Sequence, residues 1–195
     1  MNDPRLERWL EAMLATPGLT AVRAPAEARR VHIAESLHLL EAVREVPGPL
    51  VDVGSGGGAP GIPLAAALPQ LDVTLLEASR RKCDFLERAA AEFANVRVVW
   101  GRAEEQAPDE YGVAVAKALA SPPVAAELLL PLVRGGGRAL LLHGPSADLE
   151  AVAAVARRLN AEAEDVGPYF VLRKLGPTPP GFPRRPGMAK KRPLA

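Results

Sequence analysis

The stretch Leu50-Val-Asp-Val-Gly-Ser-Gly-Gly-Gly-Ala-Pro-Gly61 decides the fold of this chain. Its first four residues form an apolar run that predicts a short buried strand. The glycines that follow let the backbone take positive φ and approach a ligand without a Cβ clash. A helix expected beyond them offers free N–H groups and the positive end of a dipole. The stretch therefore predicts the turn with which a doubly wound α/β domain binds a nucleoside-containing cofactor.

Two classes of cofactor fit this turn. The range Gly56–Gly61 matches the dinucleotide pattern G-x-G-x-x-G. Asp52, two residues before Gly54, argues against NAD, because a carboxylate can hold a methionine ammonium or order water beside it but is a poor neighbour for pyrophosphate. Pro60 and Pro63 flank the third glycine and widen the turn. We therefore expect S-adenosylmethionine, and methyl transfer as the reaction.

Three further candidate positions follow the ends of later predicted strands. Glu77 closes the second strand, where it can accept hydrogen bonds from both ribose hydroxyls or cap the helix beginning near Ser79. After the third strand, the Ala103 backbone would meet the adenine edge and Glu104 would accept from the exocyclic amine; an exposed loop turn is the alternative. Lys117 ends the fourth strand, where open α/β sheets bind ligands, and can reach a cofactor carboxylate or a substrate phosphate.

Apolar runs and helical periodicities alternate along the chain. Strands are predicted at 50–53, 72–76, 96–100, 112–116, 138–142, 161–166 and 169–175, and helices at 4–14, from 25, and at 62–68, 79–93, 122–133 and 148–159. Strands separated by helices imply parallel pairing through right-handed crossovers. Gly167-Pro168 implies a closing hairpin and so one antiparallel edge strand, while 134–137 is predicted as a glycine turn. The fold class is therefore α/β and Rossmann-like, with a mostly parallel sheet.

The chain divides by composition into three segments. We expect a short helical N-terminal lead-in at 1–48, a cofactor-binding core at 49–175, and a basic, proline-rich tail at 176–195. A length of 195 residues is typical of one domain. The apolar runs fall short of the roughly 20 residues that span a bilayer, and the charged N-terminus lacks a signal-peptide core. We therefore expect a cytoplasmic protein with no membrane partner.

Cysteine and charge limit the partners. The single Cys83 excludes an internal disulfide and a cysteine-based metal cluster, and we expect no metal. From Val166 onward the chain has seven Lys or Arg residues and no Asp or Glu, whereas residues 1–165 hold 17 basic and 23 acidic residues. A cationic tail on an acidic body indicates an anionic partner, nucleic acid first, although a solvated tail is the alternative. The expected phosphate contacts are Arg184, Arg185, Lys190, Lys191 and Arg192.

Taken together, these motifs resemble one family, the small-subunit rRNA guanine-N7 methyltransferases called RsmG or GidB. The resemblance covers nearly the whole chain from Leu19, and its glycine motif and its tail are separate signals. It rests on His32-Ile-Ala-Glu-Ser36, the glycine motif Asp52–Leu64, the acid and basic helix in Leu75–Leu86, Arg102-Ala-Glu104, and the ending Pro177–Leu194.

The resemblance implies a class I methyltransferase fold with a seven-stranded sheet and S-adenosylmethionine as methyl donor. It implies N7 of one guanine in 16S rRNA as the acceptor, within the small ribosomal subunit or its precursor. Guanine N7 carries a free lone pair, so we expect no strong general base. The cofactor contacts that carry over are Gly54, Ala59, Ala103, Glu104 and the position of Lys117. The glycine turn itself adds Gly56 and Gly58 as expected cofactor contacts.

Two positions depart from the family pattern. The fourth strand usually ends in Ser-Arg-Ala but here in Ala116-Lys-Ala118, which keeps the charge and loses the bidentate fork of arginine. The fifth usually ends in Lys-Gly, where this chain has His143-Gly144. We take Lys117, His143 and His32 as substrate-side candidates and expect a monomer. The alternatives are a small-molecule methyltransferase, a diverged non-catalytic protein associated with RNA or the ribosome, and, more distantly, an NAD oxidoreductase.

Overall fold

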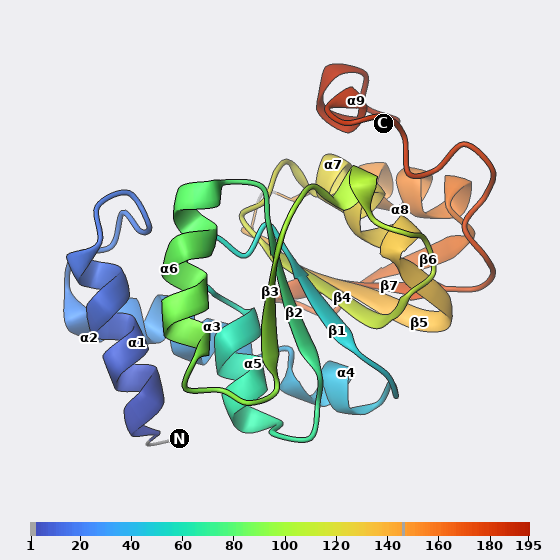
Figure 1. The fold of residues 1–195 in the computed structure, drawn as a ribbon. Coiled ribbons are helices and arrows are strands. Elements are labelled where there is room, and N and C mark those ends of the chain that lie inside the picture. The colour runs from blue at the N-terminus through green and yellow to red at the C-terminus, as the bar shows by residue number, and fades with distance from the viewer. Residues whose placement is uncertain (1–2, 146) are drawn as a thin grey trace.

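The computed structural model describes residues 3–145 and 147–195; residues 1 and 2 of the predicted lead-in and residue 146 of the predicted core lie outside it. Seven strands form one sheet in the order β3-β2-β1-β4-β5-β7-β6 (Figure 1). The strands are β1 (Leu50–Val53), β2 (Val73–Glu77), β3 (Val96–Trp100), β4 (Tyr111–Lys117), β5 (Val133–Leu142), β6 (Ala161–Asp165) and β7 (Tyr169–Lys174).

The strand pairing confirms the predicted fold class. Strands β3, β2, β1, β4 and β5 are parallel to their neighbours, and β7 runs antiparallel to both β5 and β6. The antiparallel strand thus lies between β5 and the edge strand β6. The predicted turn at Gly167-Pro168 joins β6 to β7, and the short connection permits only antiparallel pairing.

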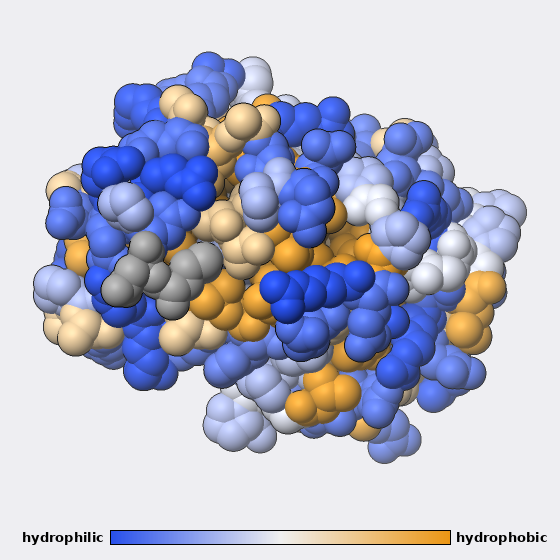
Figure 2. Space-filling model, turned by 90° about the horizontal axis from the view of Figure 1, so that it is seen from below, coloured by the Kyte–Doolittle hydropathy of each residue, from blue (hydrophilic) through white to orange (hydrophobic). Residues whose placement is uncertain are grey.

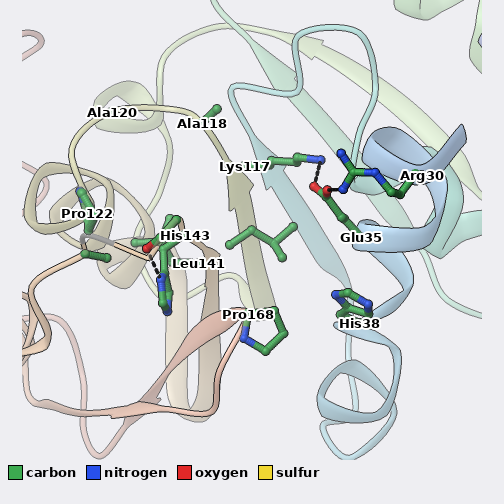
Figure 3. Close-up of a pocket in the computed structure, with 13 residues that line it drawn as sticks. Arg30, Glu35, His38, Lys117, Ala118, Ala120, Pro122, Leu141, His143 and Pro168 are labelled. Atoms are coloured by element: carbon green, nitrogen blue, oxygen red, sulfur yellow. Dashed lines mark hydrogen bonds and ion pairs between the residues drawn. The ribbon is translucent and has the colours of Figure 1, made fainter. Parts of the chain in front are cut away.

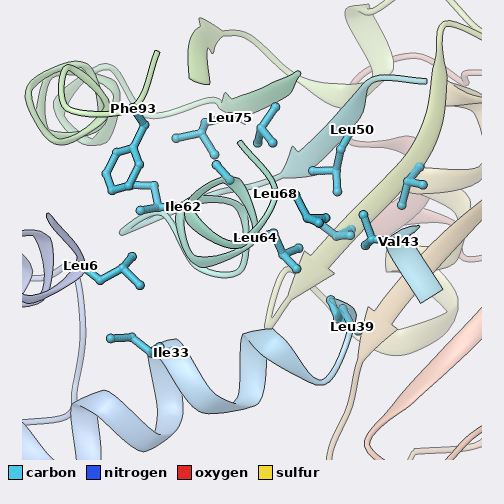
Figure 4. Packing of buried hydrophobic residues seen from close by; sticks show 14 of the residues in the cluster. Leu6, Ile33, Leu39, Val43, Leu50, Ile62, Leu64, Leu68, Leu75 and Phe93 are labelled. Carbon is cyan, nitrogen blue, oxygen red and sulfur yellow. The ribbon is translucent and has the colours of Figure 1, made fainter. Parts of the chain in front are cut away.

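Helices cover both faces of the sheet. The α-helices are α1 (Pro4–Ala15), α2 (Pro25–Ala28), α3 (Glu35–Leu37), α4 (Leu40–Arg44), α5 (Gly61–Ala67), α6 (Arg80–Ala90), α7 (Pro122–Leu129), α8 (Leu149–Arg158) and α9 (Met188–Lys191). Side chains alternate between the faces with period two, so Val113 and Val115 join the core under α1 and α5, while Ala114 and Ala116 face α7 and α8. Figure 4 shows the first of these cores, in which Leu64 of α5 packs among the sheet and the lead-in helices.

The lead-in packs directly against the glycine turn. Four apolar side chains of α1, on one helical face, are buried, as their spacing predicts. Trp9 also donates its indole N–H to the carbonyl oxygen of Gly57 at 2.8 Å. The helix predicted from Pro25 is not a continuous α-helix, because the segment Arg29–Ala34 is wound as a π-helix between α2 and α3. The lead-in therefore supports the candidate site, although the division into three segments stays a prediction.

Two boundaries differ most from the sequence prediction, and the others by at most three residues. The predicted glycine turn at 134–137 lies inside β5, where Tyr111 pairs with Val133 but Val113 pairs with Arg138. The residues between them form a bulge, in which Gly136 takes a φ of +82° that side chains disfavour. The predicted helix at 122–133 is α7 followed by a 3-10 turn, Leu130–Leu132, because Pro131 cannot donate to an α-helical bond.

All the parallel strands end at one edge of the sheet, at which α6 and α7 begin and near which α9 lies (Figure 1). The opposite end of the molecule is shown in Figure 2, where apolar residues are visible between polar groups on either side. A cavity of about 350 Å³ lined by Val43, Val46, Leu68 and Leu71 lies before the start of β1 and β2. Open α/β sheets bind ligands at the carboxyl ends of their strands, which directs attention to the α6 and α7 edge.

Candidate active site

Two cavities adjoin at the carboxyl ends of the strands. The Glu77 cavity, about 340 Å³, is lined by residues that follow β1, β2, β3 and β4, including Gly54, Glu77 and Glu104. The Lys117 cavity, about 710 Å³, is lined by residues that follow β4 and β5 and by the lead-in. Ala118 and Ala120 border both cavities. Both volumes lie in the usual range for ligand sites, about 300–1,000 Å³, so a cofactor and an acceptor can meet across two small side chains.

Glu77 is fixed at the end of β2 by two backbone donors. Its Oε1 accepts from the N–H of Ser79 at 2.8 Å, and its Oε2 accepts from the N–H of Gly56 at 2.9 Å. The residue is 7% exposed and lines the cavity. A carboxylate has about four acceptor positions, so this one can cap the turn before α6 and still accept from two ligand hydroxyls. Both predicted roles are therefore compatible with its geometry.

Gly54 is the residue of the glycine turn that borders the cavity. Its φ is +69°, and a Cβ there would collide with Cδ1 of Leu119. Only glycine combines this backbone conformation with the close approach. Gly56 also has positive φ but turns its N–H toward Glu77. The cavity wall does not include Gly56, Gly58 or Ala59, so their predicted cofactor contacts stay predictions.

Asp52 lies beneath the glycine turn and not on the cavity wall. It is 1% exposed, and its Oδ2 accepts from the N–H of Gly61 at 2.9 Å. A Cβ on Gly61 would lie 2.8 Å from this oxygen, so glycine is needed for the contact. The pKa of Asp52 is raised to about 7, chiefly by burial; the Gly61 hydrogen bond lowers this pKa, and the charge of Glu77 raises it. Asp52 therefore orders the turn, and its expected contact with a methionine ammonium stays a prediction.

Asp52 is expected to make stability depend on pH. The pKa of Asp52 is higher in the folded protein than in the unfolded chain. Its stabilising contribution to the free energy of unfolding is therefore complete below about pH 4 and is lost as the pH rises through about 7. Asp52→Asn keeps an acceptor for Gly61 but cannot ionise. We expect the free energy of unfolding of wild type, relative to this variant, to fall by about 2 kcal/mol between about pH 5 and about pH 7. Urea titrations of both proteins measure it, and parallel pH profiles would contradict the prediction.

The Lys117 cavity is organised by an ion-pair network from the lead-in (Figure 3). Lys117 Nζ lies 2.9 Å from Glu35 Oε2, and Glu35 Oε1 lies 2.8 Å from Arg30 Nη1. Lys117 also donates to the carbonyl oxygen of Val31, in the π-helical segment. π-Helical turns often occur at functional sites, because they leave backbone groups free for other partners. Lys117 therefore borders this cavity and not the Glu77 cavity, so its predicted contact with the cofactor stays a prediction, whereas its neighbour Ala118 borders both cavities.

Glu35 and Arg30 were not among the residues predicted for the site. Glu35 stands in the sequence motif His32–Ser36, yet no local pattern assigns it a partner, because Lys117 is 82 residues away. His38 also lines this cavity, at an exposed position. The presence of Glu35 in this motif, shortly before the α/β core, was the one sequence feature that could have indicated the network.

The two substrate-side histidines have different surroundings. His143 lines the Lys117 cavity, but its side chain is 6% exposed and stacks on Phe170 with ring centroids 3.9 Å apart. His32 lies off both cavity walls and shares a 2.9 Å hydrogen bond with the Thr20 hydroxyl. Burial lowers the pKa of His32, and the charge of Lys117 lowers it further. Substrate contact by either histidine stays a prediction.

The tail folds back onto the domain, and one of its five predicted phosphate ligands is already paired. Arg184 donates from Nε and Nη2 to the two carboxylate oxygens of Glu127, at 2.6 and 2.7 Å. The Glu127 side chain is 3% exposed, so this is a buried bidentate pair. Arg184 is thus held by Glu127, and its expected contact with phosphate stays a prediction. The remaining four predicted ligands, which are exposed, are Arg185, Lys190, Lys191 and Arg192.

No described helix has both the length and the apolar character to cross a membrane. In residues 3–145 and 147–195, no three His, Cys, Asp or Glu side chains form a cluster suited to a metal ion.

A mostly parallel seven-stranded sheet, a glycine turn after β1 and a buried acid ending β2 define a class I S-adenosylmethionine-dependent methyltransferase. Solved structures show the same fold: a geranyl diphosphate C-methyltransferase from Streptomyces coelicolor A3(2) aligns with a TM-score of 0.58 at 16% identity, over 80% of this chain and 69% of that one. A putative S-adenosyl-L-methionine-dependent methyltransferase from Methanococcus maripaludis aligns with a TM-score of 0.55 at 14% identity, over 78% and 90%.

The sequence comparisons identify the family. The family model described as rRNA small subunit methyltransferase G matches residues 5–171. The ribosomal RNA small subunit methyltransferase G of Pelotomaculum thermopropionicum is 37% identical over 90% of this chain and 82% of that protein. The protein of the same name from Thermotoga neapolitana is also 37% identical, over 96% and 89%. The chain belongs to the rRNA small subunit methyltransferase G family.

Proposed function

We propose that this protein transfers the methyl group of S-adenosylmethionine to N7 of a guanine in 16S rRNA. Its substrate is the small ribosomal subunit or a precursor of it. The observation that carries the proposal is the pair of cavities that meet at Ala118 and Ala120, one lined by Glu77 and the other by Lys117, in a chain of this family.

The Glu77 cavity has the groups that an adenosine needs. The Glu77 carboxylate can accept from the two ribose hydroxyls, and the Ala103 backbone and Glu104 follow β3 where an adenine would lie. Gly54, directly after β1, lines the cavity where the amino-acid end would lie. S-Adenosylmethionine supplies an electrophilic methyl group on its sulfonium. The wall of this cavity also includes the apolar residues Leu76, Leu119 and Val124.

The Lys117 cavity fits the acceptor base. Guanine N7 has a lone pair and needs no deprotonation, so the residues have only to orient the base in line with the methyl group. Such positioning can supply up to about 7–11 kcal/mol of the barrier. Glu35 offers acceptors to the N–H groups of a guanine, and Arg30 and Lys117 balance its charge. Ala118 and Ala120, which line both cavities, place only methyl side chains at the boundary between them.

Cations around the Glu77 cavity support an RNA substrate. Lys82, Arg102 and Lys190 border it, and Arg185, Lys191 and Arg192 are exposed on the same tail. Phosphate contacts of this kind position an RNA without selecting its sequence and weaken as salt rises. We propose that the protein works as a monomer in the cytoplasm, where ribosomal subunits are assembled.

The proposed function is tested by mass spectrometry of 16S rRNA nucleosides from a strain lacking the gene. We expect one 7-methylguanosine to disappear and to return with the wild-type gene, but not with a Glu77→Ala variant. An unchanged nucleoside profile would overturn the proposal. It would favour a small-molecule acceptor if the purified protein turns over cofactor without RNA, and a non-catalytic ribosome-associated role if it binds cofactor without turnover.

A further inference from the structure

The C-terminal segment 184–192 closes one side of the Glu77 cavity. It runs past the carboxyl edge of the sheet, and α9 packs against α7 (Figure 1). Gly187, Ala189 and Lys190 line the cavity, and Ala189 is 3% exposed. A segment whose sequence indicates a basic RNA-binding tail thus also forms part of the wall around the predicted cofactor.

Two contacts hold this segment in place. The buried pair between Arg184 and Glu127 fixes its start to α7, and Arg184 Nη2 also donates to the carbonyl oxygen of Arg192 at 2.8 Å. One arginine therefore joins both ends of the segment to the domain. The second contact is made by Gly187, whose N–H donates to Glu104 Oε1 at 2.8 Å. Gly187 has a φ of +80°, with which its N–H reaches this oxygen.

Glu104 connects the segment to the nucleobase end of the cavity. It follows β3, within the turn Ala103–Glu105, and both Ala103 and Glu104 line the cavity. Its carboxylate has acceptor positions beyond the one that Gly187 uses. The position of Glu104 relative to an adenine therefore depends on the segment that the Arg184–Glu127 pair anchors.

We infer that residues 184–192 are a wall of the cofactor site and that Arg184 is a positioning residue for the adenosine end of the cofactor. The inference deepens the proposed function and rests on it. Arg184 does not touch the cavity; it acts through Gly187, Ala189 and Glu104. Since Lys190 and Lys191 lie on the same segment, RNA phosphates bound there would hold the wall closed, and cofactor and RNA would bind with positive coupling.

The test is calorimetry with S-adenosylhomocysteine and with methylthioadenosine, which has the adenosine but lacks the amino acid. Arg184→Ala is expected to raise the Kd of both ligands about tenfold, the equivalent of one or two hydrogen bonds. Arg184→Lys, which keeps the charge and loses the fork, should recover part of the loss. Arg158→Ala, at an exposed position at the end of α8, should leave both Kd values unchanged. In turnover, Arg184→Ala should raise KM for S-adenosylmethionine and leave kcat within about twofold.

A folded Arg184→Ala protein with wild-type Kd values for both ligands would overturn the inference. Because this change leaves Glu127 buried without a partner, it can unfold the chain. Hydrogen exchange on the wild-type protein then decides. Saturating methylthioadenosine should slow exchange in the peptide 184–192 and leave the β6–β7 turn at 166–168 unchanged. Unchanged exchange at 184–192 would overturn the inference, whereas a wild type that binds neither ligand would overturn the proposed function itself.

Discussion

Replacing Glu77 with alanine should weaken S-adenosylhomocysteine binding about a hundredfold, which is about 2.7 kcal/mol. Two hydrogen bonds from ribose hydroxyls to a carboxylate would be lost, each worth about 1.5–3 kcal/mol in a buried site. The N–H groups of Gly56 and Ser79 would also lose their acceptor, so the turns after β1 and β2 would be less ordered. Isothermal calorimetry of the purified proteins measures the effect.

A second variant of Glu77 and a matched control distinguish the charge of this side chain from its packing. Glu77→Gln keeps one acceptor oxygen and the packing of the side chain but loses the charge, so we expect an intermediate loss. Glu162→Gln makes the same change on the exposed edge strand β6 and should bind as wild type does. NAD should produce no heat with any of the proteins. A Glu77→Ala protein whose Kd stays within about threefold of wild type would show that this acid does not hold the cofactor.

Phe170→Ala should lower the free energy of unfolding by about 3–5 kcal/mol. Phe170 lies on β7, the antiparallel strand, and is fully buried. It pairs in register with Leu141 of β5 and Asp165 of β6, and its ring supports His143. Truncation leaves a cavity that the sheet on both sides cannot fill, so the cost includes both lost burial and lost contacts. Urea unfolding followed by circular dichroism measures it.

The Phe170→Ala change should affect the Lys117 cavity and leave the Glu77 cavity intact. His143 would lose its stacking partner on the wall of the Lys117 cavity, whereas the wall of the Glu77 cavity includes no residue of β5 or β7. We therefore expect rRNA methylation to fall while S-adenosylhomocysteine still binds to the folded fraction. Leu175→Ala, just beyond β7 and 63% exposed, should change stability by no more than about 0.5 kcal/mol. A loss below about 1 kcal/mol for Phe170→Ala would contradict the packing argument.

The sequence alone predicted most of the fold because the signals for its elements are local. The strand Val96–Trp100 was predicted with its observed bounds. An apolar run between turn residues predicts a strand from a few neighbouring positions alone. Gly54 could be recognised in the same way, because a positive φ at the end of a strand is a property of the residue itself. The Gly167-Pro168 turn likewise specified an antiparallel hairpin.

Other features follow from contacts between residues that are distant in the chain. The Glu35–Lys117 pair joins positions 82 residues apart, and the Arg184–Glu127 pair joins positions 57 apart. Charge counts alone cannot separate a paired arginine from an exposed one, so Arg184 was grouped with the phosphate ligands. The glycines at 134–137 were taken for a turn because only the register with β4 distinguishes a bulge within a strand from its start.

The sequence alone thus determined the succession of strands and helices along the chain, the glycine turn and the acid that ends β2. Backbone preferences and side-chain periodicity are local properties, so they can be recognised without the tertiary structure. Tertiary structure decided that Asp52 lies beneath the turn, that a lead-in acid faces Lys117, and that the basic tail borders the Glu77 cavity. The physical reason is that burial and ion pairing depend on which surfaces meet after the helices pack on the sheet, and no short stretch of sequence contains that information.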